Sequence, residues 1–149
     1  MTIVTDTTET ASAPQLKEPR IHLFDRDDDV RDSLKLLLES NGFTVHAFAG
    51  RPEFLAAATE RPADCLILGF NRLIVEGLDL LAILRRRQVE TPAIFIVGGG
   101  DALTRASALR AGAEAYLERP TEEDTLIRAV MDAMPRQPAV KGRASMQAR

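Results

Sequence analysis

The chain has little of the material from which disulfide frameworks and metal centres are built. Its 149 residues include one cysteine, Cys65, and two histidines that stand far apart in the sequence. A single cysteine excludes an internal disulfide framework and a cysteine-rich zinc site, and two separated histidines offer few ligands for a metal. His22 and His46 fall in strand-like segments and are interpreted as packing residues, and Cys65 as a buried hydrophobic side chain.

Long hydrophobic runs and an excess of one charge are also lacking. No apolar run approaches the roughly 18–20 residues that a membrane span needs. The 19 basic and 22 acidic residues give a net charge of −3, which indicates neither a strongly basic nucleic-acid binder nor an acidic, solvating chain. The first 19 residues have neither the basic nor the apolar region of a signal peptide. The expectation is a cytoplasmic protein without a membrane segment.

Composition divides the chain into three parts. Its length fits one domain, and a 45% share of hydrophobic residues is enough for a core. Residues 1–19 lack periodicity and predict a flexible N-terminal arm, residues 20–134 form the domain, and residues 135–149 predict a flexible C-terminal tail. The tail has four basic residues and no acid. It is interpreted as a frayed terminus, with contact to nucleic acid or an acidic partner as the alternative.

Within the domain, a short apolar run followed by an amphipathic stretch occurs five times. Such alternation predicts a parallel sheet with helices on both faces, because parallel neighbours need a crossover helix. The expected fold is α/β: a flavodoxin-like, doubly wound, five-stranded (βα)5 sandwich of three layers. The apolar runs are residues 21–24, 43–48, 65–68, 93–97 and 115–117.

Short polar residues predict where the helices begin. Asp27 or Asp28 is expected to cap the first helix, and Asp101 the helix that runs to Ala111. Thr121 is expected to cap the last helix, with Asp124 three residues later in a pattern similar to a capping box.

The segments that follow the strands resemble the receiver domain of bacterial response regulators, a CheY-like family, and its FixJ-type subgroup in particular. The resemblance covers residues 20–134 and rests on Asp25-x-Asp27, Gly77-Leu78-Asp79-Leu80, Arg110-Ala111-Gly112-Ala113 and the run from Tyr116 to Pro120. It implies transfer of a phosphoryl group from a histidine kinase to an aspartate. It also implies Mg²⁺ held by two acids after the first strand, with a hydroxyl and a lysine contacting the phosphoryl oxygens.

Carried over residue by residue, the family pattern is altered at four positions. The first acid is kept as Asp25, but the second is Arg26. The phosphoacceptor aspartate falls on Gly69, the hydroxyl residue on Val97 and the lysine on Arg119. The resemblance therefore implies a degenerate pseudo-receiver without a phosphoacceptor. Its pocket comprises Asp25, Arg26, Gly69, Asn71, Val97 and Arg119.

Charge counting in this pocket predicts that Mg²⁺ does not bind. Asp25, Arg26 and Arg119 sum to +1, which repels a divalent cation. No metal, no cofactor and no catalytic residue are expected, and the chain is not expected to be an enzyme. Arg26 is expected to form an ion pair with Asp25 or with another nearby acid.

The function that follows is a stand-alone receiver in two-component signalling that binds proteins without phosphorylation. The expected partner is a histidine kinase or another response regulator, with a homodimer as a further option. No DNA-binding helix-turn-helix follows Met134, so direct DNA binding is not expected. The residues assigned to the interface are Tyr116, Leu103, Leu109 and Glu118, and packing alone is expected to set the position of Tyr116.

Two other functions stay open. Arg26 and Arg119 could hold an anion or a small molecule beside Gly69, which would make the chain a sensor. Alternatively, Asp25 or Glu76 could accept a phosphoryl group in place of the missing aspartate.

Overall fold

The computed structural model describes residues 18–71 and 73–134. The expected C-terminal tail and all but two residues of the expected N-terminal arm lie outside the described residues. Among the helices that are described, none is both long and apolar enough to span a membrane.

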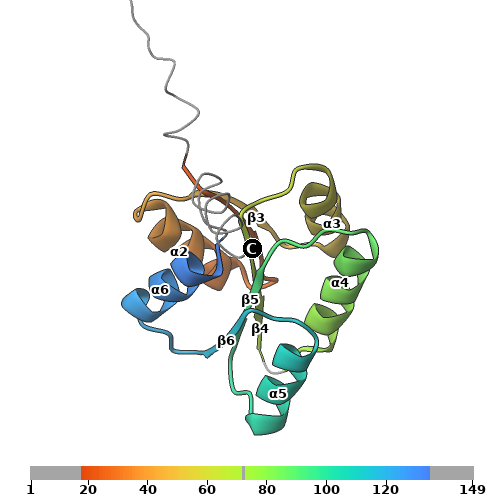
Figure 1. Ribbon diagram of the computed structural model, residues 1–149. Coiled ribbons are helices and arrows are strands. Elements are labelled where there is room, and N and C mark those ends of the chain that lie inside the picture. Colours follow the sequence, from red (N-terminus) through yellow and green to blue (C-terminus); the bar gives the residue numbers. More distant parts are fainter. Residues whose placement is uncertain (1–17, 72, 135–149) are drawn as a thin grey trace, which may run out of the picture.

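Five parallel strands form one sheet in the order β3-β2-β4-β5-β6, with a helix after each strand (Figure 1). This confirms the predicted doubly wound α/β fold. Helices α2 and α6 lie on one face of the sheet, and α3, α4 and α5 lie on the other. The strands are β2 (Arg20–Phe24), β3 (Thr44–Phe48), β4 (Cys65–Phe70), β5 (Ala93–Val97) and β6 (Ala115–Glu118). The helices are α2 (Asp28–Glu39), α3 (Arg51–Glu60), α4 (Val75–Arg86), α5 (Ala102–Arg110) and α6 (Glu123–Ala133).

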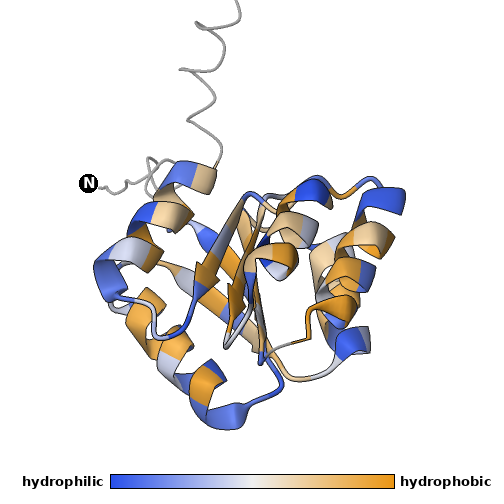
Figure 2. Ribbon diagram, turned by 90° about the horizontal axis from the view of Figure 1, so that it is seen from below, coloured by the Kyte–Doolittle hydropathy of each residue, from blue (hydrophilic) through white to orange (hydrophobic). Residues whose placement is uncertain are grey.

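Two hydrophobic cores lie on the two faces of the sheet. Every residue of β4 and β5 is buried, as expected for central strands covered by helices on both sides. Alternate residues of β2 divide between the cores, so that Phe24 packs toward α3 and α4, while Ile21 and Leu23 pack toward α2 and α6. Figure 2 shows this arrangement as hydrophobic strands between helices in which hydrophobic and hydrophilic residues alternate.

The helix ends agree with the sequence at two of the three predicted caps. Asp27 accepts a hydrogen bond from the Val30 backbone N–H, and Asp101 accepts one from the Thr104 N–H. The prediction for Thr121 is wrong, because α6 begins one residue later with Glu122 as its N-cap. The Thr121 hydroxyl donates backward to the Glu118 carbonyl instead, at 2.9 Å.

Candidate functional site

A cleft of about 740 Å³ lies at the carboxyl edge of the sheet, where the sequence placed the pocket. Five of the six residues predicted for the pocket line it: Asp25, Arg26, Gly69, Asn71 and Arg119. The sixth, Val97, is fully buried at the end of β5, one residue before Gly98, which also lines the cleft. The topology thus brings together the ends of β2, β4, β5 and β6.

The deepest contact in the cleft is an ion pair between Asp25 and Arg119. Asp25 follows β2 and its side chain is 5% exposed, whereas Arg119 follows β6 and its side chain is 23% exposed. Arg119 Nη2 donates to Asp25 Oδ2 at 2.7 Å, and Arg119 Nη1 donates to the Phe70 carbonyl at 3.1 Å. Asp25 Oδ1 accepts from the Asp27 backbone N–H at 2.9 Å. The pair therefore ties the ends of β2, β4 and β6 together.

This pair occupies the space next to Gly69. A Cβ built on Gly69 would overlap Asp25 Oδ2 and would lie 2.8 Å from Arg119 Nη2. Real Cβ atoms essentially never approach other heavy atoms so closely. Asp25 and Arg119 can meet in this geometry only because position 69 has no side chain.

A second ion pair lies nearer the surface. Arg26 holds Glu76 of α4 through two contacts, Nη2 to Oε2 at 2.5 Å and Nε to Oε1 at 3.0 Å. The hydrogen bond to Glu76 raises the pKa of Arg26. The pair expected for Arg26 is thus formed with Glu76, while Asp25 binds Arg119, a pairing that the sequence did not predict. Arg51 of α3 extends the network, with Nη2 at 2.5 Å from Asp79 Oδ2.

The net charge predicted for the pocket is wrong. Asp27 and Glu76 also line the cleft, so two arginines face three carboxylates and the formal charge is −1 instead of +1. The sequence count omitted these two acids because it included only the positions of the family pattern.

The residues present still do not fit Mg²⁺, for a different reason. Both oxygens of Asp25 are already bonded, and both oxygens of Glu76 contact Arg26. Residue 26, where the family pattern has a second acid, is a cation. Across residues 18–71 and 73–134, no group of three or more His, Cys, Asp and Glu side chains is arranged to hold a metal ion. The obstacle is the occupation of the carboxylates, and no step involving Mg²⁺ can be derived.

The residues assigned to an interface lie at different depths. Leu103 and Leu109 of α5 are 77% and 39% exposed, and Glu118 is exposed at the end of β6. Tyr116 is only 4% exposed and packs in the core with Val97. Tyr116 therefore lies beneath this surface, not on it. The sequence also gave no indication of Arg105, whose guanidinium lies over the Tyr116 ring.

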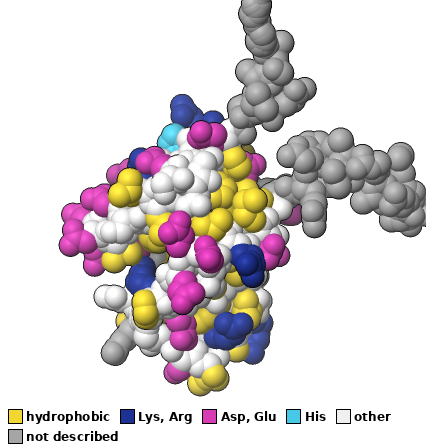
Figure 3. Space-filling view, turned by 90° about the vertical axis from the view of Figure 1, so that its left-hand side faces the viewer, with side chains coloured by type: hydrophobic (Ala, Val, Ile, Leu, Met, Phe, Trp, Pro, Cys, Tyr) yellow, Lys and Arg dark blue, Asp and Glu magenta, His cyan; other side chains and the backbone are white. Residues whose placement is uncertain are grey.

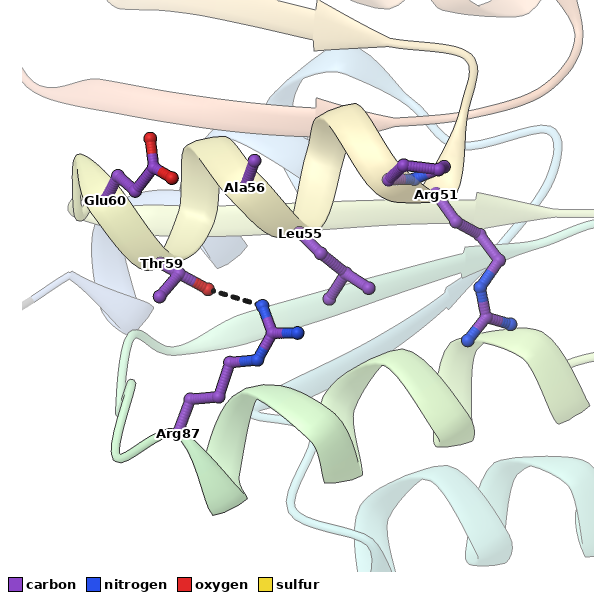
Figure 4. A pocket seen from close by; sticks show the side chains of 7 residues that line it. Arg51, Leu55, Ala56, Thr59, Glu60 and Arg87 are labelled. Atoms are coloured by element: carbon purple, nitrogen blue, oxygen red, sulfur yellow. Dashed lines mark hydrogen bonds between the residues drawn. The ribbon is translucent and has the colours of Figure 1, made fainter.

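Two other surface features differ from the cleft. A groove of about 510 Å³ runs between α3 and α4 and is lined by none of the predicted site residues; in it, Arg87 donates to the Thr59 hydroxyl at 3.1 Å (Figure 4). The face formed by α2 and α6 has acidic and hydrophobic side chains close together (Figure 3). Neither surface contains the residues that the sequence predicted for the pocket.

Known proteins resemble this chain in both sequence and structure. Residues 21–131 match the sequence profile of the response regulator receiver domain. The transcriptional regulatory protein FixJ of Azorhizobium caulinodans is 33% identical over 116 residues, which cover 78% of this chain and 55% of that protein. The FixJ protein of Bradyrhizobium diazoefficiens is 32% identical over 128 residues, which cover 85% and 62%.

Solved structures agree with the sequence matches. The crystal structure of FixJ-N aligns with a TM-score of 0.71 at 31% identity, over 78% of this chain and 93% of that chain. The chain spans 55% and 62% of the length of the two curated FixJ relatives. These matches therefore do not show that this chain has the activity of the complete FixJ proteins.

Proposed function

This chain belongs to the response regulator receiver domain family, and we propose that it acts in two-component signalling as a protein-interaction module that works without phosphorylation. The observation that supports the proposal is the Asp25–Arg119 pair packed against Gly69. Position 69 is where the family pattern has its phosphoacceptor, and glycine offers no carboxylate. The space for an acceptor side chain is filled by the pair.

The other carboxylates of the cleft are poor replacements for an acceptor. An attacking carboxylate oxygen needs a free lone pair directed at phosphorus. Asp25 is 4% exposed and accepts hydrogen bonds on both oxygens, and Glu76 is held by Arg26 on both oxygens. A phosphoryl acceptor at Asp25 or Glu76 would have to break an ion pair first.

Sensing of an anion is disfavoured by the same contacts. Arg26 and Arg119, which the sequence offered as anion ligands, are each bonded to a carboxylate. An incoming anion would have to displace that carboxylate, in a cleft whose formal charge is −1. Docking of a protein needs no such exchange, and the chain is accordingly proposed to be a signalling module and not an enzyme.

Helix α5 provides a surface for such docking. It fully buries only one of its residues, Ala108, while Leu103 and Leu109 are exposed. A partner that covered these leucines would remove apolar surface from water. The partner is proposed to be a histidine kinase or another response regulator, with a second copy of this chain as the remaining option.

Phosphoryl donors test the proposal. After incubation with acetyl phosphate and Mg²⁺, intact-mass analysis is expected to show no added phosphoryl group, and the receiver domain of a FixJ protein serves as the labelled control. Beryllofluoride with Mg²⁺ is expected to leave the amide NMR shifts of residues 101–134 unchanged. A labelled protein, or widespread shifts in this range, would contradict the proposal.

A further inference from the structure

The buried position of Tyr116 is unfavourable for its polar hydroxyl group. Among residues 18–71 and 73–134 the enclosed hydroxyl oxygen has no hydrogen-bond partner, and burial raises the pKa of this tyrosine. A buried hydroxyl without a partner destabilises a fold. Other contacts must therefore hold the ring in this inward position.

Gly100, in the loop between β5 and α5, leaves the space that the hydroxyl occupies. A Cβ built on Gly100 would overlap the Tyr116 hydroxyl oxygen and lie 3.2 Å from Tyr116 Cζ and 3.4 Å from Thr104 Cγ2. A side chain of any size at position 100 would therefore push the outer end of the ring away from this loop.

Arg105 covers the ring from α5. Its guanidinium carbon lies 5.8 Å from the centroid of the Tyr116 ring, within the range of a cation–π contact. Its Nη1 also donates to the Tyr116 carbonyl at 3.3 Å. The same side chain thus touches both the ring and the backbone of β6, and this contact links α5 to the strand.

We infer that Tyr116 stays permanently inward because Gly100 leaves space for its hydroxyl and Arg105 holds its ring and backbone. The surface formed by α5 and β6 is thereby fixed in one form. The inference deepens the proposed function, since a module that no phosphoryl group switches needs another cause for a constant surface. Val97, at the end of the adjacent strand β5, lies in the same core as Tyr116 and has no polar side-chain group to bond the tyrosine hydroxyl.

The composition of the chain makes the inference easy to test. Tyr116 is the only tyrosine and there is no tryptophan, so intrinsic fluorescence reports on this side chain alone. In the wild-type chain, acrylamide is expected to quench the fluorescence several-fold less than in the urea-unfolded chain. Gly100→Ala is expected to raise the quenching constant several-fold while the far-UV circular dichroism stays native, and Arg105→Ala is expected to raise it by less.

Matched controls separate the effect of Gly100 and Arg105 on Tyr116 from general effects on α5. Leu103→Ala and Arg110→Ala alter exposed residues of the same helix and are expected to leave quenching unchanged. Strong quenching in the wild-type chain, or no change on Gly100→Ala, would overturn the inference.

A second measurement covers the case in which Gly100→Ala unfolds the chain. Tyr116→Phe removes the oxygen that the new Cβ would overlap. The double variant Gly100→Ala/Tyr116→Phe is therefore expected to recover at least half of the loss in Tm caused by Gly100→Ala alone. An equal loss in both backgrounds would overturn the inference. These measurements use no phosphoryl donor. Labelling of the wild-type chain by acetyl phosphate would therefore contradict the proposed function but not the inference that Tyr116 is held inward.

Discussion

At position 69, the absence of a side chain allows two charged groups to meet. We expect Gly69→Asp to lower the free energy of unfolding by about 1–3 kcal/mol, because it places a second carboxylate against Asp25 in a buried site. Acetyl phosphate is expected not to label this variant, since residue 26 remains an arginine. Urea denaturation and intact-mass analysis measure the two effects.

Gly50→Ala is the matched control for this prediction. A Cβ on Gly50 would overlap only the end of the exposed Glu53 side chain, which can turn away. Its cost is expected to stay below about 0.5 kcal/mol. Labelling of Gly69→Asp, or unchanged stability, would show that the pair moves aside more easily than its contacts indicate.

The two arginines of the cleft are expected to differ in their contribution to stability. Arg119→Ala leaves the nearly buried Asp25 carboxylate without its charged partner and is expected to cost about 1–3 kcal/mol. Arg26→Ala removes an ion pair whose arginine side chain is 58% exposed, and its cost is expected to stay below about 1 kcal/mol. Parallel urea titrations compare them, and an equal or reversed order would refute the assignment.

Among the elements, β2 and α3 are joined by a buried histidine. His22 of β2 is 2% exposed, and its Nε2 donates to the Arg61 carbonyl at 2.8 Å. Its Nδ1 has no partner in the part of the chain that the structure describes. The charged or titratable side chains near it are His46 and Arg20, and Arg61 contributes its backbone carbonyl. Burial lowers the pKa of His22 below its ordinary value of 6.5, and it outweighs the hydrogen bond to the Arg61 carbonyl, which raises the pKa; the nearby His46 and Arg20 act in the same direction as burial.

The sign of the pH dependence follows from this lowered pKa. His22 takes up a proton more readily in the unfolded chain than in the folded chain. The stabilisation that depends on neutral His22 is therefore complete above about pH 6.5 and is lost as the pH falls toward the lower pKa of His22 in the folded chain. We expect the loss in Tm between about pH 7 and pH 5 to be smaller in His22→Gln, whose amide can still donate to the Arg61 carbonyl but does not titrate. His46→Gln removes the exposed neighbour that lowers the pKa of His22 and is expected to reduce the loss by less than His22→Gln does. A loss in His22→Gln equal to that of the wild-type chain would count against the prediction.

Most of the elements could be predicted from the sequence, because the apolar runs of β4 and β5 are buried on both faces. Asp27 and Asp101 also marked the starts of α2 and α5 correctly. The start of α6 could not be predicted, since a threonine hydroxyl can donate to a carbonyl behind it or accept from an amide ahead of it. Thr121 takes the first option.

For the molecule as a whole, the topology predicted the place of the cleft but not its contacts. Parallel strands bring Asp25, Gly69 and Arg119 to one edge. Which carboxylate each arginine binds depends on side-chain directions that spacing does not encode. The charge count from the sequence left out Glu76 and Asp27, and including them reverses the sign of the net charge of the cleft.

The ion pairs of the cleft are expected to make the stability of the whole molecule independent of Mg²⁺. At millimolar Mg²⁺, the Tm of the wild-type chain should not change. The triple variant Arg26→Asp/Gly69→Asp/Arg119→Lys replaces both pairs with carboxylates and a lysine, and we expect Mg²⁺ to raise its stability. At ten times the Kd, the gain would be about 1.4 kcal/mol.

Calorimetry with Ca²⁺-free MgCl₂ measures this gain, and NaCl at equal ionic strength is the control for screening. A saturable Mg²⁺ effect on the wild-type chain would show that the carboxylates are less firmly occupied than their hydrogen bonds indicate.

The contact of Asp25 and Arg119 above Gly69 also restricts the order in which mutations can accumulate. Any side chain added at position 69 collides with both partners, and loss of Arg119 leaves the buried Asp25 without its counter-ion. A first change at position 69 or 119 therefore lowers stability before any chemistry is regained. Positions 25, 69 and 119 are thus coupled, and a change at one of them is expected to be tolerated only with a compensating change at another.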